Sequence, residues 1–236
     1  MTTGRFDAIL FDAGGVLIMP DPMAVGAALD PWAGPRPIQA FHRAHHLALS
    51  TLERSVLTDG GGHLESADWT LYRRTYASSI GVTDDHLDDA TVAMSRIWSP
   101  IMWRFRIEET MGALWQLRRL GVPMGIVSNA NGQVEHTLRY EGVCQVGAGA
   151  GVQMVCVIDS EVVGVAKPNP AIFTPALAAL GDPDPARVAY IGDSFINDVA
   201  GAAAAGLIPL HLDPYDDYAD FDHERITSVH DLLAWV

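Results

Sequence analysis

The sequence predicts an α/β protein built on a doubly wound parallel sheet. Short apolar runs alternate with amphipathic segments in residues 106–236, which is the order typical of repeated strand–helix units. Most of the apolar runs end abruptly at glycine or at polar residues, as strands do where they leave a sheet. Residues 18–103 interrupt this alternation with helical patterns only. We therefore expect one α/β core domain, residues 1–17 and 104–236, with a helical domain, residues 18–103, inserted after the first strand.

The strands and helices of the core follow from apolar periodicity. The first strand is expected at Ala8–Phe11, where Asp12 and two later glycines end an apolar run. Further strands are expected at 124–127, 154–158, 187–191 and 207–212. Helices are expected at 108–119, 132–140, 170–180 and 196–205, and a capping pattern at Ser228 begins one more at the C-terminus.

The inserted segment contains three expected helices. Residues 18–22 carry proline and methionine and are expected to form a loop. Apolar residues then recur at spacings of three and four over 35–57, which predicts an amphipathic helix. A second helix is expected from Ser66 to near Gly81, and a third from Thr83 to Pro100.

Composition excludes several classes of protein. A hydrophobic fraction of 49% over 236 residues supports a large buried core and argues against disorder. No apolar run is long enough to span a bilayer, and the N-terminus has no signal-peptide pattern, so we expect a cytoplasmic protein with no membrane partner. The two cysteines have neither disulfide-framework nor metal-ligand spacing.

The charge balance is strongly acidic. A net charge of −14 disfavours nucleic acid as a partner, because phosphate backbones attract clustered cations. Acidic residues concentrate in 213–222, which is expected to be a solvated surface loop. The positive charges are fourteen arginines and one lysine, Lys167. A compact ammonium fits a crowded anionic pocket where a planar guanidinium does not.

Polar side chains follow the ends of several expected strands. Asp12 follows the first strand, Ser128 the second and Asp193 a later one, with Asp198 about one helical turn further on. Lys167 precedes the helix at 170–180. Because the carboxyl ends of parallel strands share one edge of the sheet, these groups can converge on a single site.

The chemistry of this set fits phosphoryl transfer. A carboxylate such as Asp12 can attack phosphorus and form an acyl phosphate. Mg²⁺ would offset the repulsion among the carboxylates and the substrate, and Lys167 would stabilise charge on the transferring group. The Ser128 hydroxyl suits a phosphate oxygen. No phosphate loop of the nucleotide-triphosphatase type is present, which disfavours that class.

Four ordered motifs resemble those of the haloacid dehalogenase-like (HAD) hydrolases. They are ILFDAGGVL at 9–17, IVSN at 126–129, VGVAKPNPAIF at 163–173 and IGDSFINDVAGA at 191–202. The resemblance implies a Rossmann-like core with a helical cap, and a Mg²⁺-dependent phosphatase acting on a small phosphomonoester. The roles that it implies are Asp12 as nucleophile, Lys167 as charge stabiliser, Ser128 and Asn129 as phosphate binders, Asp12, Asp193 and the Gly14 carbonyl as metal ligands, and Asp198 in support.

The chain departs from this family at Gly14. Family phosphatases usually carry an aspartate there, which acts as the general acid for the leaving group. General acid catalysis typically contributes ~10²–10⁴-fold. The substrate could have a good leaving group, another residue (Asp21, His42, His45 or His46) could supply the proton, or the protein could be a poor catalyst.

Two other functions stay open at this point. A metal-independent 2-haloacid dehalogenase would use the same nucleophile and lysine, but Asp193 and Asp198 would then only add repulsion. A non-enzymatic binding protein would explain Gly14, although the other site residues are retained. The sequence does not identify the substrate, and it leaves a homodimer through the cap as an open possibility.

Overall fold

The computed structural model describes residues 4–60, 62, 64 and 67–236, and these form two compact units. The first unit comprises the described residues up to Ile18 together with Arg106–Pro214 and Asp220–Val236. The second, the helical unit, comprises Met19–Phe105 and Tyr215–Ala219.

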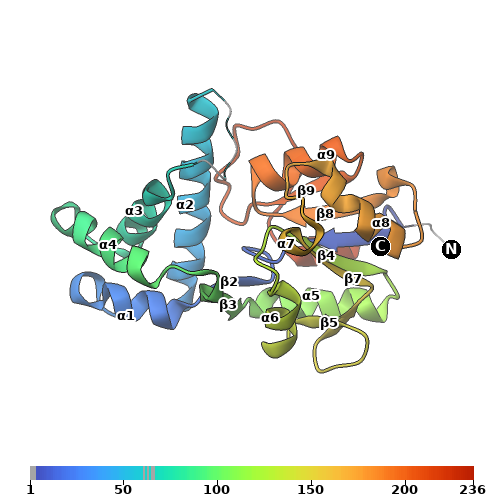
Figure 1. Cartoon of the computed structure of the whole chain (residues 1–236), viewed down its shortest axis with the longest axis horizontal. Helices are drawn as coiled ribbons and strands as arrows, with labels where there is room; N and C mark the ends of the chain where they lie inside the picture. Colours follow the sequence, from blue (N-terminus) through green and yellow to red (C-terminus); the bar gives the residue numbers. More distant parts are fainter. Residues whose placement is uncertain (1–3, 61, 63, 65–66) are drawn as a thin grey trace. The chain divides into compact units, whose positions relative to one another are not determined.

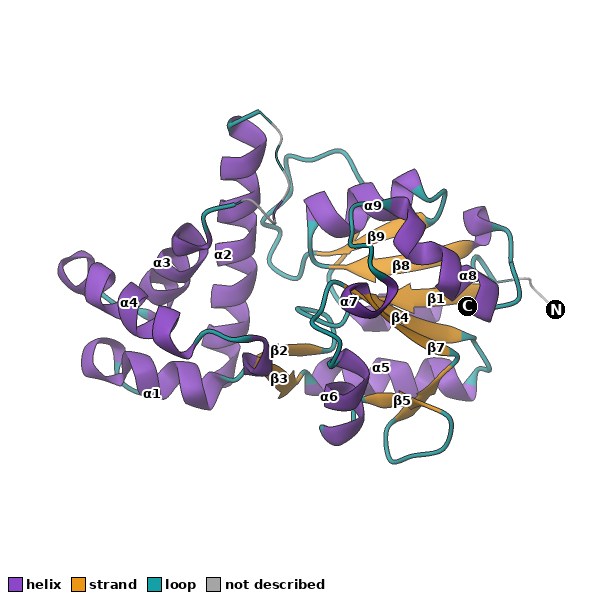
Figure 2. Cartoon of the chain, viewed as in Figure 1, coloured by secondary structure: helices purple, strands orange, loops and turns teal. Residues whose placement is uncertain are grey.

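A six-stranded, entirely parallel sheet forms the centre of the first unit (Figures 1 and 2). Its strands are β1 (Ala8–Phe11), β4 (Met124–Ser128), β7 (Cys156–Asp159), β8 (Val188–Gly192), β9 (Ile208–Leu212) and β10 (Arg225–Ile226). Their order across the sheet is β10-β9-β8-β1-β4-β7. The expected α/β fold with a parallel sheet is confirmed, with β1 at the centre between β8 and β4.

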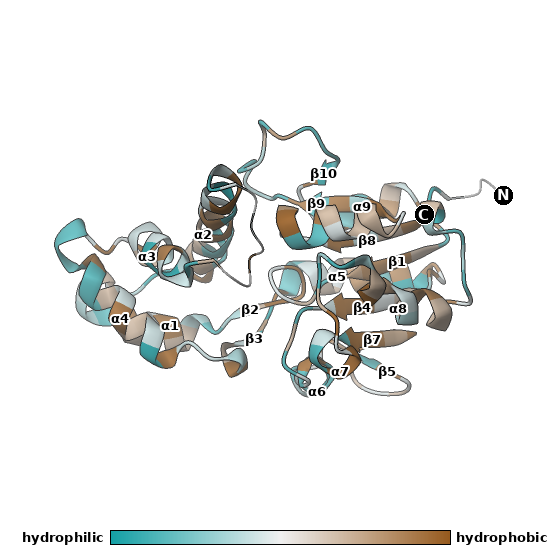
Figure 3. Cartoon of the chain, turned by 45° about the horizontal axis from the view of Figure 1, so that its top comes forward, coloured by the Kyte–Doolittle hydropathy of each residue, from teal (hydrophilic) through white to brown (hydrophobic). Residues whose placement is uncertain are grey.

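Both faces of this sheet are covered. Leu10, Val127 and Tyr190 belong to one buried cluster that also contains Ile172 and Phe173. The strand residues that alternate with them, such as Ile9 and Phe11, are fully buried as well. Because the side chains on both faces of the sheet are buried, the strand sequences are almost continuously apolar. The arrow of strand β4 is accordingly largely brown in Figure 3.

Helical segments follow the strands of the first unit; those expected at 108–119, 132–140, 170–180 and 196–205 are present, and short ones at 160–163 and 185–187 were not predicted. The segments are α5 (Glu108–Arg119), α6 (Val134–Tyr140), α7 (Ser160–Val163), α8 (Thr174–Ala179) and α9 (Ala200–Ala204), together with the 3₁₀ segments η4 (Pro170–Phe173), η5 (Pro185–Arg187) and η7 (Val229–Ala234) and the π-helical turn η6 (Phe195–Val199). Acidic residues occupy the first turn of α5 and arginines its last turn, which suits the helix dipole. The capping box at Ser228 is present, although the element that it begins is a 3₁₀ helix.

The strand expected over 154–158 is divided in two. Strand β6 (Val152–Met154) pairs with β5 (Cys144–Val146) in a small separate sheet, whereas β7 begins at Cys156 and pairs with β4. The chain therefore changes its hydrogen-bonding partner at Val155, whose side chain is exposed. The apolar run continues across this change of partner, so the sequence gives no signal for it.

The helical unit contains four α-helices among its described residues. They are α1 (Pro22–Ala33), α2 (Ile38–Thr58), α3 (Trp69–Ile80) and α4 (Leu87–Ile97), with short turns η2 (Asp84–His86) and η3 (Pro100–Met102). The expected start of α3 at Ser66 lies outside the described residues. None of the helices that the structure describes is long and apolar enough to cross a bilayer.

The expected loop at 18–22 was wrong. Residues Ile18–Pro20 form strand β2, which pairs with β3 (Trp103–Arg106), and α1 begins at Pro22. The Asp21 carboxylate accepts a hydrogen bond from the Met23 backbone N–H at 2.9 Å and so caps α1. Pro22 is favourable at the first helical position, because the missing N–H would have no partner there.

The segment 215–219 belongs to the helical unit. The sequence pattern assigns it to the core domain and to a solvated surface loop, and the structure corrects both assignments. Asp217 receives two hydrogen bonds from the Arg43 guanidinium, at 2.5 and 2.9 Å, and its backbone carbonyl accepts another from Arg54 at 2.7 Å. Tyr218 is buried, and its hydroxyl donates to the Glu53 carboxylate. Three charged groups of α2 therefore hold this segment.

Candidate active site

Three neighbouring strands place polar groups at one edge of the sheet. Asp12 follows β1, and Asp193 follows the adjacent strand β8; Ser128 ends β4 on the other side of β1. Asp198 lies in the turn η6, just after Asp193. One carboxylate oxygen from each of Asp12, Asp193 and Asp198 lies within 4.8 Å of the others. The structure thus brings together the three carboxylates that the sequence singles out.

Lys167 is the cationic centre of this group. Its side chain is buried, and its Nζ lies 3.0 Å from Asp12 Oδ1, 2.6 Å from Asp198 Oδ1 and 2.8 Å from the Tyr190 hydroxyl. An ammonium has three N–H groups, and here each faces an acceptor. Burial opposes the charged form, but Asp12 and Asp198 outweigh it and raise the lysine pKa, so Lys167 carries its charge at neutral pH.

The backbone of Lys167 is held by Asn129. The amide of the Asn129 side chain donates to the Lys167 carbonyl at 3.0 Å, and its oxygen accepts from the Lys167 N–H at 2.8 Å. The side chain that was expected to bind phosphate is therefore engaged with the lysine backbone. A phosphate contact from Asn129 would have to come from its backbone N–H.

Asp198 connects the lysine with the turn after β8. Its Oδ2 accepts a hydrogen bond from the Ser194 N–H at 3.0 Å, while its Oδ1 binds Lys167. Gly192 packs directly against this carboxyl group: a Cβ at Gly192 would lie 2.2 Å from Asp198 Cγ. Glycine is required at position 192 because any side chain would displace Asp198.

Burial raises the pKa values of the other two carboxyl groups. It raises the pKa of Asp12 to about 7, against the lowering effect of Lys167. Burial and, next, the nearby charge of Asp198 raise the pKa of Asp193 well above its usual range. One lysine therefore does not neutralise the cluster, and a divalent cation would relieve the repulsion that remains.

The donor set fits Mg²⁺. Carboxylate oxygens are the ligands that this cation prefers, and it commonly binds one or two of them together with substrate oxygens. Asp12 and Asp193 could each offer one such oxygen. Gly14 lies in the turn after β1 and can offer only backbone atoms, so the chain has no second carboxyl group two residues after Asp12.

Tyr190 is a site residue that the sequence analysis does not identify. It lies in the middle of β8, and its hydroxyl, besides accepting from Lys167, lies 2.8 Å from the Val127 carbonyl and 3.2 Å from Asp198 Oδ1. Burial, first, and the charge of Asp198 raise its pKa well above 10, so the phenol stays neutral. The only signal in the sequence is a tyrosine within an otherwise apolar buried strand.

A histidine pair lies against the other side of the Asp193 turn. His211 on β9 is fully buried, its Nε2 lies 2.9 Å from the Asp193 carbonyl, and its Nδ1 lies 2.7 Å from His223 Nε2. Because a carbonyl only accepts hydrogen bonds, Nε2 of His211 must carry the proton. Burial lowers the pKa of His211 to about 4, so the ring is neutral near pH 7.

The other candidate proton donors lie in the helical unit and have partners there. The Asp21 carboxylate caps α1. His42 Nδ1 lies 2.9 Å from the Tyr215 hydroxyl, and His45 Nδ1 lies 2.8 Å from the Tyr72 hydroxyl. His46 packs against both of these histidine rings. These contacts explain the positions of the side chains without a catalytic task.

Comparison with known proteins finds similar sequences and similar solved structures. The family model described as "Hydrolase: haloacid dehalogenase-like hydrolase" matches residues 6–206. A zebrafish (Danio rerio) haloacid dehalogenase-like hydrolase domain-containing protein 3 is 28% identical over 67% of this chain and 64% of its own length. A glyceraldehyde 3-phosphate phosphatase of Methanopyrus kandleri is 29% identical over 53% of this chain and 55% of its own. The match therefore spans less than two thirds of the length of either relative.

Solved structures share the fold over nearly the whole chain. A HAD-hydrolase, YfnB from Bacillus subtilis, solved bound to magnesium, has a TM-score of 0.58 at 17% identity and covers 98% of both chains. A 2-haloacid dehalogenase from Pseudomonas syringae has a TM-score of 0.54 at 20% identity, over 97% of this chain and 98% of its own. At these identities the likeness establishes the fold, which both kinds of enzyme share.

Proposed function

Because the chain belongs to the haloacid dehalogenase-like hydrolases, we propose that it is a Mg²⁺-dependent phosphatase of a small phosphomonoester. The observation that carries this proposal is the cluster of Asp12, Asp193 and Asp198 around one buried lysine. A reaction that only needs a carboxylate nucleophile and a cation would be served by Asp12 and Lys167. The additional carboxylates favour a metal-dependent reaction, because without a cation they oppose the binding of an anion.

The metal would be held by the carboxylates of Asp12 and Asp193 and by the backbone carbonyl of Gly14. When bound, Mg²⁺ supplies positive charge that offsets repulsion between these carboxylates and the substrate phosphate and stabilises the transferring group. Asp198 is held by Lys167 and by the Ser194 N–H, so we assign it to supporting the site.

Asp12 would act as the nucleophile. One of its oxygens forms a bond to phosphorus as the ester P–O bond breaks, which leaves an aspartyl phosphate and an alcohol that takes up a proton. Water then attacks the phosphorus, releases inorganic phosphate and regenerates the carboxylate. Lys167, 3.0 Å from Asp12 Oδ1, would stabilise negative charge on the transferring group, and the Ser128 hydroxyl would donate to a phosphate oxygen.

Gly14 would restrict the range of substrates. With no carboxyl group at this position, departure of the alcohol depends on its own acidity or on a donor from elsewhere, such as Asp21 or a histidine of the helical unit. The helical unit, inserted after β1 and acting as the cap, would carry the residues that determine the substrate. We therefore expect phosphates with good leaving groups, such as anomeric or acyl phosphates, to be hydrolysed fastest.

The relatives support phosphate chemistry over dehalogenation. The Methanopyrus kandleri relative is a phosphatase by name, and a pyrimidine 5'-nucleotidase of Escherichia coli is 46% identical over a shorter stretch, 24% of this chain. The fold neighbours include a magnesium-bound hydrolase as well as dehalogenases, so the fold alone does not choose between them.

The test is phosphate release from a panel of phosphomonoesters, with Mg²⁺ and with EDTA, using Asp12→Asn as the blank. The proposal predicts metal-dependent release that the blank lacks. Release that EDTA leaves unchanged would refute the metal requirement. Halide release from 2-haloacids without phosphate release would establish the dehalogenase alternative, and silence in both assays would favour a binding protein.

A further inference from the structure

We propose that Tyr190 is a positioning residue for Lys167. The Tyr190 hydroxyl accepts a hydrogen bond from the third N–H of the Lys167 ammonium and keeps the ammonium aligned through the reaction. The inference rests on the proposed phosphatase function only for the expected effect of Tyr190 on the rate of phosphate release. Its structural part, the fixation of the ammonium by Tyr190, stands independently.

Among the hydrogen bonds that the structure describes, the Lys167 ammonium has no other neutral acceptor. Of its three acceptors, Asp12 and Asp198 are carboxylates, and Tyr190 is the only uncharged one, at 2.8 Å. The phenol hydroxyl can accept from Lys167 while its own proton is donated to the Val127 carbonyl, 2.8 Å away. Val127 directly precedes Ser128, so one hydrogen-bonded chain joins the lysine to the end of β4.

The tyrosine ring itself is rigidly held. It is fully buried in β8, paired on either side by β1 and β9, and the Phe173 ring meets its edge at a centroid distance of 4.8 Å. A fixed ring gives a fixed hydroxyl position. The lysine, by contrast, has a flexible four-carbon stem, so its ammonium position depends on its acceptors.

Tyr190 matters most at the point in the reaction where Asp12 changes. When Asp12 becomes an acyl phosphate, it loses its carboxylate charge and becomes a weaker acceptor. Asp198 and Tyr190 then remain as acceptors for the ammonium. Two acceptors define the orientation of the ammonium, whereas one would allow it to rotate about a single hydrogen bond. Loss of the Tyr190 hydroxyl would therefore misplace the lysine during both chemical steps and would leave one buried N–H without an acceptor.

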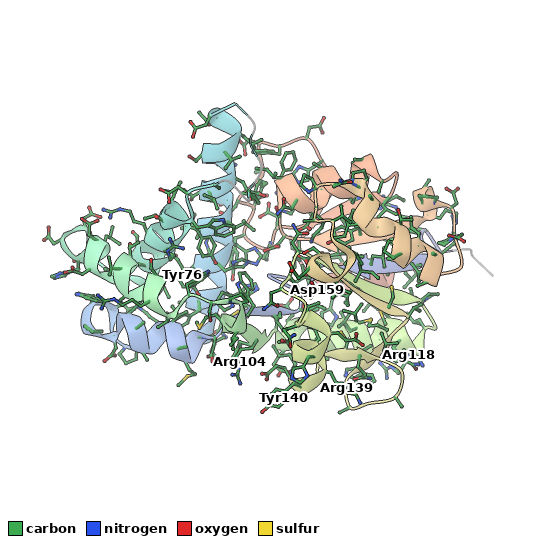
Figure 4. All side chains as sticks on the ribbon, viewed as in Figure 1. Tyr76, Arg104, Arg118, Arg139, Tyr140 and Asp159 are labelled. Atoms are coloured by element: carbon green, nitrogen blue, oxygen red, sulfur yellow. The ribbon has the colours of Figure 1, made fainter. Side chains whose placement is uncertain are left out.

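The decisive variant is Tyr190→Phe, which removes one oxygen and keeps the ring. The matched control is Tyr76→Phe in the helical unit (Figure 4), where the buried hydroxyl makes no hydrogen bond with any described residue. Because Lys167 is the one lysine in the chain, labelling with ¹⁵N-lysine gives a single Nζ signal that reports this ammonium directly.

We expect the Nζ signal of the wild type to show slow hydrogen exchange with water. In Tyr190→Phe it should shift, and exchange should become at least several times faster, while Tyr76→Phe leaves it unchanged. With p-nitrophenyl phosphate, or the best substrate of the panel, kcat of Tyr190→Phe should fall about tenfold or more with KM changed less than twofold.

The outcomes separate the two proposals. An Nζ signal and a kcat that both match those of the wild type would overturn the assignment of Tyr190. A changed Nζ signal with unchanged kcat would also overturn it, because the hydroxyl would then hold the lysine without serving the reaction. A wild type that releases no phosphate from any substrate refutes the phosphatase proposal, and the Nζ signal then still decides whether Tyr190 fixes the ammonium.

Discussion

Replacing Gly192 with alanine tests whether the close contact between the β8 turn and Asp198 holds the site together. The added Cβ would lie 2.2 Å from Asp198 Cγ and 2.3 Å from its Oδ2, and ordinary contact begins at 3.4 Å. Asp198 must therefore move away from position 192, and this movement breaks its 2.6 Å contact with the Lys167 ammonium. Separating a buried ion pair costs about 3–5 kcal/mol, and overpacking adds about 1–3 kcal/mol.

These magnitudes compare with a total stability of about 5–15 kcal/mol for a typical domain. We expect Gly192→Ala to lower the free energy of unfolding by at least about 3 kcal/mol in urea titrations and to abolish phosphate release. The matched control is Gly112→Ala in α5, where the nearest atoms to a new Cβ lie at 3.4 Å. That change should be neutral or stabilise by up to about 1 kcal/mol.

A double variant makes the reasoning refutable even if Gly192→Ala folds poorly. Adding Asp198→Gly removes both the Cβ and the carboxyl group that the new Cβ meets, so the combined loss of stability should be clearly smaller than the sum of the two single losses. Additive losses, or a Gly192→Ala protein with the stability and activity of the wild type, would show that this contact does not position Asp198.

Four further predictions address the nucleophile, the missing acid, proton linkage and the 215–219 segment. Asp12→Asn should abolish turnover in phosphate-release assays while its circular dichroism spectrum matches the wild type; substantial residual turnover would remove Asp12 from the nucleophile role. Gly14→Asp should raise kcat on substrates with poor leaving groups if the missing acid limits the rate, and no gain would indicate another donor or another slow step. Because the pKa of Asp12 is raised to about 7 in the metal-free protein, the folded state holds a proton there that the unfolded state has lost above the ordinary aspartate value of 3.8. As pH increases from 3.8 towards 7, the free energy of unfolding without metal should therefore fall, and the affinity for Mg²⁺, measured by calorimetry, should rise. Binding of Mg²⁺ that does not depend on pH would contradict this. Asp217→Asn should cost about 1 kcal/mol of unfolding free energy through its partly buried pair with Arg43, whereas Asp88→Asn, in an exposed pair, should cost almost nothing; equal costs would refute the difference in burial.

Much of the core was predictable because its pattern is local. Strand β1 and its end at Asp12 follow from an apolar run and the glycines after it, and the same reasoning locates Ser128 and Asp193. The parallel sheet then brings these ends to one edge, so the convergence of the carboxylates required no further information.

What the sequence could not provide depends on distant contacts or weak local signals. The ion pair between Arg43 and Asp217 joins residues 174 positions apart, so the acidic segment could not be distinguished from a solvated loop. Helix α1 contains Gly26 and Pro31, which weaken the expected helical pattern. Tyr190 resembles any core residue of a buried strand, because its function depends on the position of the Lys167 ammonium.

The most direct test of the central claim is to look for the covalent intermediate on Asp12. The protein would be mixed with the best substrate and Mg²⁺, quenched in acid within the first turnover and digested, and the peptide that carries Asp12 weighed by mass spectrometry. We predict that this peptide gains one phosphoryl group and that the gain is absent in Asp12→Asn. Turnover that proceeds while Asp12 stays unmodified at every time point would contradict the aspartyl-phosphate mechanism.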